Sequence, residues 1–88
     1  MSPMYRAWKQ AKEQAPGHLI LFRVRDFYVC FGEDAELAAE ALALTLTSRK
    51  LADGSRLAMC GVPSHAVDRY ARKLRELGHR VVVCEQTT

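Results

Sequence analysis

Three basic side chains form one group that could act on an anionic partner. Arg49 and Lys50 precede an Asp53-Gly54 turn signal and Arg56 follows it, so we predict a basic loop between two strands over 48–56. Long basic side chains on a loop can follow a phosphate backbone. They are also common on any solvated turn, and the pattern alone leaves both interpretations open.

An aromatic pair, Phe27 and Tyr28, is the second group of interest. It lies in an apolar run over 26–31 that we predict to be a strand. Successive side chains of a strand point to opposite faces, so the two rings cannot share a side. Aromatic rings in strands usually belong to the core. At the edge of a sheet, however, one of the two could be exposed.

Signs of enzymatic chemistry are few. The glycines are scattered, so there is no glycine-rich phosphate loop, and no serine lies in a GxSxG elbow. The adjacent Glu33 and Asp34 suit a helix start, with Asp34 as the predicted cap. A metal-dependent nuclease would need an Asp/Glu-x-Lys triplet, and Glu85-Gln86-Thr87 lacks the lysine. We therefore expect a protein that is not an enzyme and has no cofactor.

Cysteine and histidine spacing favours neither a disulfide framework nor a metal site. The cysteines are three, an odd number, they form no CxxC pair, and each lies in an apolar run: Cys30, Cys60 and Cys84. The histidines do not approach them at zinc-ligand spacing. We predict free thiols in a reducing compartment and no bound metal.

Length and composition indicate one globular domain over 1–88. Hydrophobic residues make up 49% of the 88 residues and charged residues 26%. No apolar run approaches the roughly 20 residues of a membrane-spanning helix, and the start does not resemble a signal peptide, so we expect a cytoplasmic protein. The net charge of +3 permits an anionic partner without requiring one.

Hydrophobic periodicity predicts an α/β fold in the order α-β-β-α-β-β-α-β, with three helices on a mixed sheet of about five strands. Ser2, Asp34 and Ser64 are the predicted helix N-caps, and Gly78 is the predicted C-terminal cap of the third helix. The predicted helices follow Ser2-Pro3, cover 35–43 and follow Ser64, and the predicted strands cover 18–24, 26–31, 44–47, 57–62 and 81–84.

The segment 23–31, RVRDFYVCF, makes the sequence resemble a known family. It is similar to the strand motif R-x-G-D-F-Y-E-x-F of the N-terminal mismatch-recognition domain of the MutS DNA mismatch repair family. The likeness continues in the same order over nearly all of the chain. Further matches are Ser2-Pro3-Met4, Glu33-Asp34-Ala35, Leu46-Thr47, the M-x-G-[IV]-P-x-H-A motif from Met59 to Ala66, and residues 81–86.

This resemblance implies a small α/β module that approaches the minor groove of kinked, mismatched or otherwise distorted double-stranded DNA. Phe27 would stack on a mispaired base, and neighbouring loops would contact the backbone. A wedge between base steps must be flat and apolar, and unstacking costs least where pairing is already poor. The family's ATPase and clamp lie in later domains, so the resemblance implies no ATPase activity here.

The sequence departs from the motif at two positions beside the expected wedge. Val29 stands where the family has a glutamate that hydrogen-bonds to the mispaired base, and Arg25 stands where it has a glycine. Ser64 also replaces a frequent aromatic residue. Losing a carboxylate and gaining a guanidinium should strengthen phosphate attraction and weaken mismatch discrimination.

Together these features predict a non-enzymatic DNA-binding module, associated with the nucleoid in a bacterium. Phe27 is the expected wedge, Val29 packs with it on one strand face, and the expected phosphate contacts are Arg25, Arg49, Lys50 and Arg56. One alternative is a protein-interaction module that docks the Phe27–Val29 face on another repair or nucleic-acid-processing protein. A nuclease is a more distant alternative.

Overall fold

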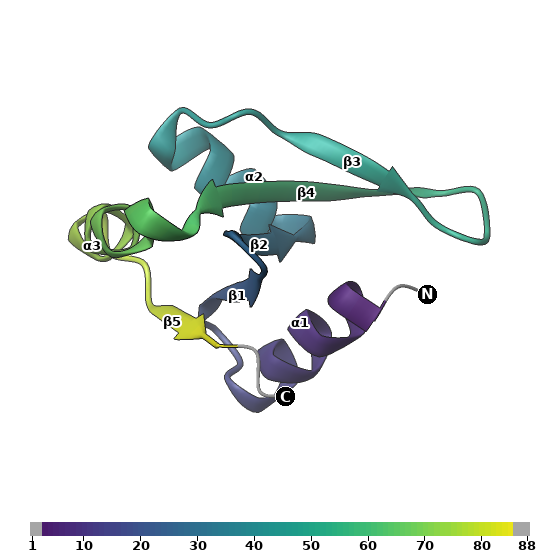
Figure 1. Ribbon diagram of the computed structural model, residues 1–88, viewed down its shortest axis with the longest axis horizontal. Helices are drawn as coiled ribbons and strands as arrows, with labels where there is room; N and C mark the ends of the chain where they lie inside the picture. The colour runs from purple at the N-terminus through teal and green to yellow at the C-terminus, as the bar shows by residue number, and fades with distance from the viewer. Residues whose placement is uncertain (1–2, 86–88) are drawn as a thin grey trace.

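The computed structural model describes residues 3–85 as a mixed five-stranded sheet with three α-helices (Figure 1). The strand order is β3-β4-β2-β1-β5, in which β5 runs parallel to β1 and the other neighbours are antiparallel. This architecture confirms the predicted fold class and element order. The elements are α1 (Pro3–Gln14), β1 (Leu19–Val24), β2 (Phe27–Phe31), α2 (Gly32–Leu42), β3 (Thr47–Lys50), β4 (Arg56–Pro63), the 3₁₀ turn η1 (Ser64–Ala66), α3 (Val67–Glu76) and β5 (Val81–Cys84).

Helix α1 covers one face of the sheet. Trp8 and Tyr5 pack edge-on against the ring of Phe31, with ring centroids 5.5 and 5.3 Å away, and the Trp8 indole donates a hydrogen bond to the Ile20 carbonyl at 2.9 Å. Phe27 and Val29 share the strand face of Phe31 because side chains alternate. The other face, which holds the buried thiols of β2 and β4, is covered by α2 and α3, which also contact β4.

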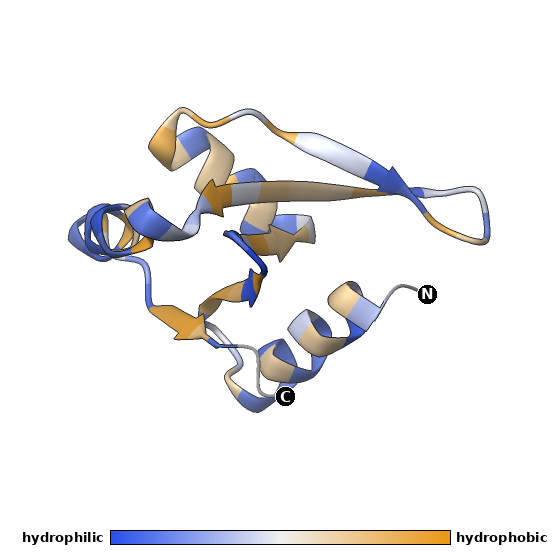
Figure 2. Cartoon of the chain, in the orientation of Figure 1, coloured by the Kyte–Doolittle hydropathy of each residue, from blue (hydrophilic) through white to orange (hydrophobic). Residues whose placement is uncertain are grey.

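The apolar strands occupy the centre, whereas β3 and the outer surface of α3 are hydrophilic (Figure 2). Among residues 3–85, no helix is long and apolar enough to cross a membrane. Gly78 follows α3 with a φ of +94°, a left-handed conformation that glycine adopts readily, which confirms the predicted C-terminal cap.

Two predicted N-caps are wrong, and the third, Ser2, lies outside the described residues. Helix α2 follows Phe31 and has no side-chain cap. Asp34 lies in its first turn, buried, where its carboxylate accepts hydrogen bonds from the Ile20 backbone N–H at 3.1 Å and from the Lys12 ammonium at 2.9 Å. The carboxylate thereby joins α1, β1 and α2. Ser64 begins η1 rather than α3 and provides no side-chain cap.

The basic segment also differs from its prediction. Residues 44–46 form no strand; β3 begins at Thr47 and pairs with β4, with Arg49 opposite Leu57 and Lys50 opposite Arg56. The basic side chains therefore lie on paired strands and not on a loop. All four residues of β3 are exposed, so β3 carries no hydrophobic alternation that could have revealed it. Backbone pairing with the more apolar β4 defines it instead.

Candidate nucleic-acid interface

Phe27 begins β2 at the tip of the β1–β2 hairpin, and its side chain is 51% exposed. The neighbouring Tyr28 is 4% exposed, and its hydroxyl donates a hydrogen bond to the Glu85 carboxylate. The sequence left open which of the two rings is exposed, and the structure decides this question. Phe27 faces solvent and Tyr28 belongs to the interior.

The hairpin turn that presents Phe27 is tight. Val24 pairs with Phe27, so Arg25 and Asp26 alone make the turn, and Arg25 has a φ of +57°. A side chain in this left-handed region costs about 1–2 kcal/mol, which explains why a glycine suits this position. The Asp26 carbonyl accepts a hydrogen bond from the Ser64 N–H at 2.8 Å, which ties the turn to the end of β4.

Phe27 borders a shallow depression of about 480 Å³ that we call the wedge face. Its floor includes Val29, Met59 and Gly61. A Cβ built on Gly61 would lie 3.7 Å from Val29 Cγ1 and 3.9 Å from Phe27 Cδ1, so the glycine keeps the floor open beside the ring. The residues that line the wedge face are Met4, Val24, Arg25, Asp26, Phe27, Val29, Arg49, Met59 and Gly61.

Val29 lies in the floor of the wedge face and is 3% exposed. It is the register partner of Phe22 on β1 and of Gly61 on β4. An isopropyl group accepts no hydrogen bond, so this position supports the Phe27 ring through apolar packing and offers no polar contact to a partner.

Arg25 and Arg49 stand at the rim of the wedge face, from the β1–β2 turn and from β3. Both are exposed, and within residues 3–85 neither guanidinium has a hydrogen bond or ion pair. Two unpaired guanidinium groups beside an exposed ring combine positive charge with apolar surface. This combination suits a phosphate-linked, stackable ligand.

Lys50 and Arg56 do not join them. The register pairs Thr47 with Met59 and Arg49 with Leu57, which places Arg49 on the wedge side of the hairpin. Lys50 and Arg56 are register partners at the next position along the two strands. Because side chains alternate along a strand, both point to the side of the hairpin away from the wedge face. There the Arg56 Nε donates a hydrogen bond to Ser48 Oγ at 2.8 Å. The structure brings together four of the six predicted site residues.

Comparison with known proteins agrees with this geometry. The family described as MutS domain I matches residues 2–88. This chain belongs to the MutS domain I family. It is 49% identical over 85 residues to the DNA mismatch repair protein MutS of Desulfitobacterium hafniense, covering 97% of this chain and 10% of that protein. The MutS proteins of Rhodopseudomonas palustris (strain BisB18) and Methanothrix thermoacetophila are 49% and 45% identical over 87 residues, covering 99% and 98% of this chain and 10% of each.

The chain therefore spans about a tenth of the length of these MutS relatives, and the predicted family resemblance is confirmed. Within this MutS domain I chain, sequence reasoning missed the contributions of Met4, Val24 and Met59 to the wedge face. Met59 lies opposite Phe31, and this placement depends on the register of β4 on β2, which the sequence of either strand alone does not contain. Met4 comes from α1, and no local pattern connects that helix to β2.

A polar cluster behind the wedge was also missed. Arg23 on β1 forms an ion pair with Glu85, with Nη1 3.4 Å from Oε1, and its guanidinium lies 5.7 Å from the centroid of the Tyr28 ring. The hydrogen bond from Tyr28 to Glu85, together with burial, raises the pKa of the Tyr28 hydroxyl. The cluster joins β1, β2 and the end of β5, and so braces the strand that carries Phe27.

No cysteine or histidine is among the residues that line the wedge face. All three cysteines are free; Cys30 and Cys60 are buried and Cys84 is half-buried. Contact with Cys60 and burial raise the pKa of Cys30, and burial raises the pKa of Cys84, so both thiols stay protonated at neutral pH. Across residues 3–85, no cluster of three or more His, Cys, Asp or Glu side chains could hold a metal ion.

Proposed function

We propose that this MutS domain I chain is a non-enzymatic module that binds mismatched or distorted duplex DNA through its wedge face. The observation that carries the proposal is the exposed Phe27 ring on a braced hairpin tip, which lines one depression together with two guanidinium groups without partners. In the proposed complex Phe27 enters the base stack from the minor groove. Arg25 and Arg49 contact phosphates on either side of the entry point.

The energetics favour weakened duplexes. Inserting a ring costs a few kcal/mol of unstacking, least where pairing is already poor, and base–aromatic stacking returns about 1–3 kcal/mol. A single module of this size buries roughly 600–1,000 Å² on DNA, so binding is weak and depends strongly on salt. Lys50 and Arg56, on the other side of the hairpin, contribute long-range attraction rather than contacts at the wedge.

Discrimination between mismatches is reduced by Val29. Its buried isopropyl group replaces the glutamate that the family motif would place on the strand face of the ring, so the wedge senses how easily a base step opens and not which base is mispaired. Arg25 adds attraction to any backbone. We therefore propose a sensor of duplex weakness rather than of one particular mismatch.

Titration of matched, mismatched and bulged duplexes against the chain tests this function. Phe27→Ala should remove the preference for distorted duplexes while leaving a weaker, salt-sensitive attraction. Leu37→Ala, which removes another exposed apolar side chain from α2, is the matched control and should bind like the parent. If Phe27→Ala binds every duplex as the parent does, the wedge assignment is wrong.

A protein-docking role is the second candidate, because the wedge face is mostly apolar. Phe27 would then fill a pocket on another repair or nucleic-acid-processing protein. Ionic strength separates the two functions, since phosphate contacts weaken steeply with salt and an apolar interface does so much less.

A further inference from the structure

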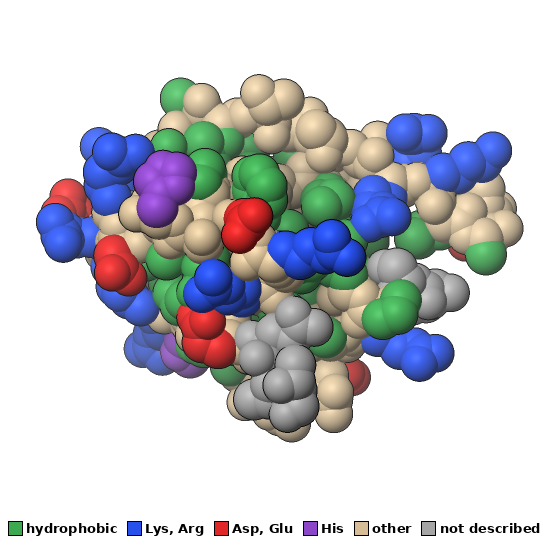
Figure 3. Space-filling view, in the orientation of Figure 1, with side chains coloured by type: hydrophobic (Ala, Val, Ile, Leu, Met, Phe, Trp, Pro, Cys, Tyr) green, Lys and Arg blue, Asp and Glu red, His purple; other side chains and the backbone are tan. Residues whose placement is uncertain are grey.

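Asp26 is an acidic side chain within a surface that we assign to nucleic acid. It immediately precedes Phe27, lines the wedge face and is exposed. On the side of the molecule shown in Figure 3, Asp and Glu side chains lie scattered among Lys and Arg side chains and beside hydrophobic surface. A carboxylate repels phosphates, so a surface that only attracted a DNA backbone would gain nothing from an acidic group at its tip.

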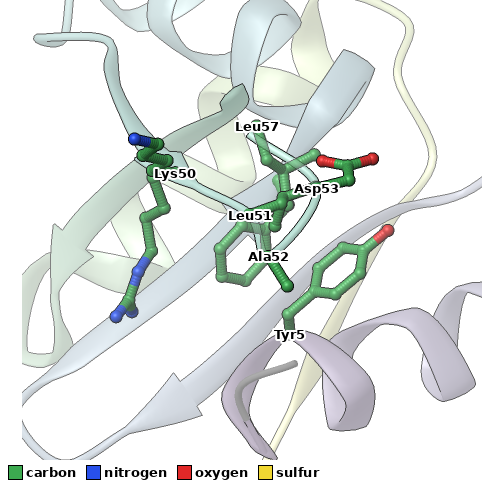
Figure 4. Close-up of a pocket in the computed structure, with 8 residues that line it drawn as sticks. Tyr5, Lys50, Leu51, Ala52, Asp53 and Leu57 are labelled. Carbon is green, nitrogen blue, oxygen red and sulfur yellow. The ribbon is translucent and has the colours of Figure 1, made fainter. Parts of the chain in front are cut away.

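The Asp26 carboxylate has hydrogen-bonding capacity that the protein does not use. Within residues 3–85 it takes part in no hydrogen bond or ion pair, not even with the adjacent Arg25. Asp53 on the β3–β4 loop, labelled in Figure 4, differs: its Oδ1 accepts hydrogen bonds from the Ser55 hydroxyl at 2.6 Å and from the Ser55 N–H at 2.9 Å. Asp53 therefore stabilises its own loop, whereas the Asp26 carboxylate is available to a partner.

The backbone that carries Asp26 is fixed beside the Phe27 ring. Arg25 and Asp26 form the two-residue turn, and the Asp26 carbonyl accepts a hydrogen bond from the Ser64 N–H at 2.8 Å. Consecutive Cα atoms are about 3.8 Å apart, which is close to the rise of one base pair. A ring that enters a base step therefore brings the Asp26 carboxylate to the groove edge of a neighbouring base pair.

The minor groove offers a carboxylate one favourable partner. A·T and T·A pairs present only the acceptors adenine N3 and thymine O2 there, whereas a G·C pair adds a donor, the 2-amino group of guanine. A carboxylate accepts hydrogen bonds and donates none. It is therefore repelled by the edge of an A·T pair and attracted to the amino group of a G·C pair.

We propose that Asp26 is a specificity-determining residue that accepts a hydrogen bond from the 2-amino group of a guanine next to the step entered by Phe27. This inference rests on the proposed function, in which the ring enters from the minor groove. It concerns the paired neighbour and not the mispaired base. Asp26 thus adds a preference for sequence context to a sensor of duplex weakness.

Mismatched duplexes that differ only in the minor-groove edge of the pairs flanking the mismatch provide the test. Hypoxanthine in place of guanine removes the 2-amino group, and 2,6-diaminopurine in place of adenine adds one. The full chain should bind the guanine duplex about fivefold more tightly than the hypoxanthine duplex, and the diaminopurine duplex about fivefold more tightly than the adenine duplex. Pair strength alone predicts the opposite order, because a pair that lacks the amino group is weaker and costs less to unstack.

Substitution of Asp26 connects the preference to this side chain. Asp26→Ala should abolish both fivefold differences. It also removes a repulsive charge, so it should bind duplexes with only A·T flanking pairs at least as tightly as the parent. Asp68→Ala removes another exposed carboxylate, from the first turn of α3 and outside the wedge face, and is the matched control that should keep both differences.

Equal binding of the guanine and hypoxanthine duplexes by the parent chain overturns the inference, and this measurement does not depend on the folding of a variant. A guanine preference that Asp26→Ala keeps also overturns it. In both cases the proposed function stands if Phe27→Ala still loses the preference for distorted duplexes. Failure of the proposed function is a different result, in which Phe27→Ala binds every duplex as the parent does, and it would overturn both.

Discussion

The two hairpins of this protein differ in how firmly they are held. The β1–β2 hairpin turns in two residues, is tied to β4 through the Asp26 carbonyl, and is braced by the cluster of Arg23, Tyr28 and Glu85. The β3–β4 hairpin ends in a longer exposed loop, and every residue of β3 is exposed. A wedge must not yield when it enters a stack, whereas a surface that follows a backbone gains from adjustment. Under the proposed function, the first hairpin would therefore insert into the stack, and the second would supply a backbone contact.

The largest expected effect is on the stability of the first hairpin where β1 begins, because Asp34 on α2 accepts a hydrogen bond from the Ile20 N–H there. Asp34→Ala removes two charge-assisted hydrogen bonds from a buried site, so we expect the free energy of unfolding in urea to fall by about 2–3 kcal/mol. Asp53→Ala is the comparison variant: it removes an exposed carboxylate from the loop of the second hairpin and should leave the urea midpoint unchanged. Equal losses for the two variants would contradict the difference in rigidity.

Restoring the family's glutamate should sharpen the first hairpin's readout. Val29→Glu places a hydrogen-bond acceptor beside Phe27, and we expect the ratio of mismatched to matched duplex affinity to rise about tenfold. Competitive titration of the two duplexes measures this ratio. Val29→Leu is the control for altered packing and should leave it unchanged, and an unchanged ratio for Val29→Glu would refute the discrimination argument.

Substitutions on the two sides of the second hairpin should differ in how they change the salt dependence of DNA affinity. Arg49→Ala removes a phosphate contact at the wedge face, so the slope of log affinity against log salt should become shallower by about 0.9. Lys50→Ala, one residue away on the opposite side, should change the slope less. Equal changes in the two slopes would show that the register of β3 and β4 does not decide which cation meets DNA.

The smallest effect concerns the brace behind Phe27. Tyr28→Phe loses the hydrogen bond to Glu85 and should lower the free energy of unfolding by about 1 kcal/mol at pH 8. Because the pKa of Tyr28 is raised on folding, its contribution is complete below its usual pKa near 10 and is lost as pH rises through the folded value. Unfolding followed from pH 8 to 11 should therefore decline less in Tyr28→Phe than in the parent, and parallel curves would contradict the role of this hydroxyl.

Local sequence patterns predict the fold class and the element order, but neither the bounds of β3 nor the arrangement of the site. Apolar runs predict the order of helices and strands because hydrophobic periodicity reflects which residues of each segment are buried. Gly78 marks the end of the third helix. The local sequence predicts Asp34 as a helix cap, because the Ile20 N–H and the Lys12 ammonium that it binds are distant in sequence. Which of Arg49 and Lys50 faces the wedge depends on the register of β3 on β4, and a single strand does not contain that information.

Strand β3 also has a consequence for how copies of this protein behave near one another. It forms one outer edge of the sheet, and an outer edge is a template to which a strand of another molecule can add. A short strand that carries two adjacent cations is a poor template of this kind, because a second copy would bring the same charges alongside. The side chains that we assign to nucleic acid thus also discourage self-association through this edge.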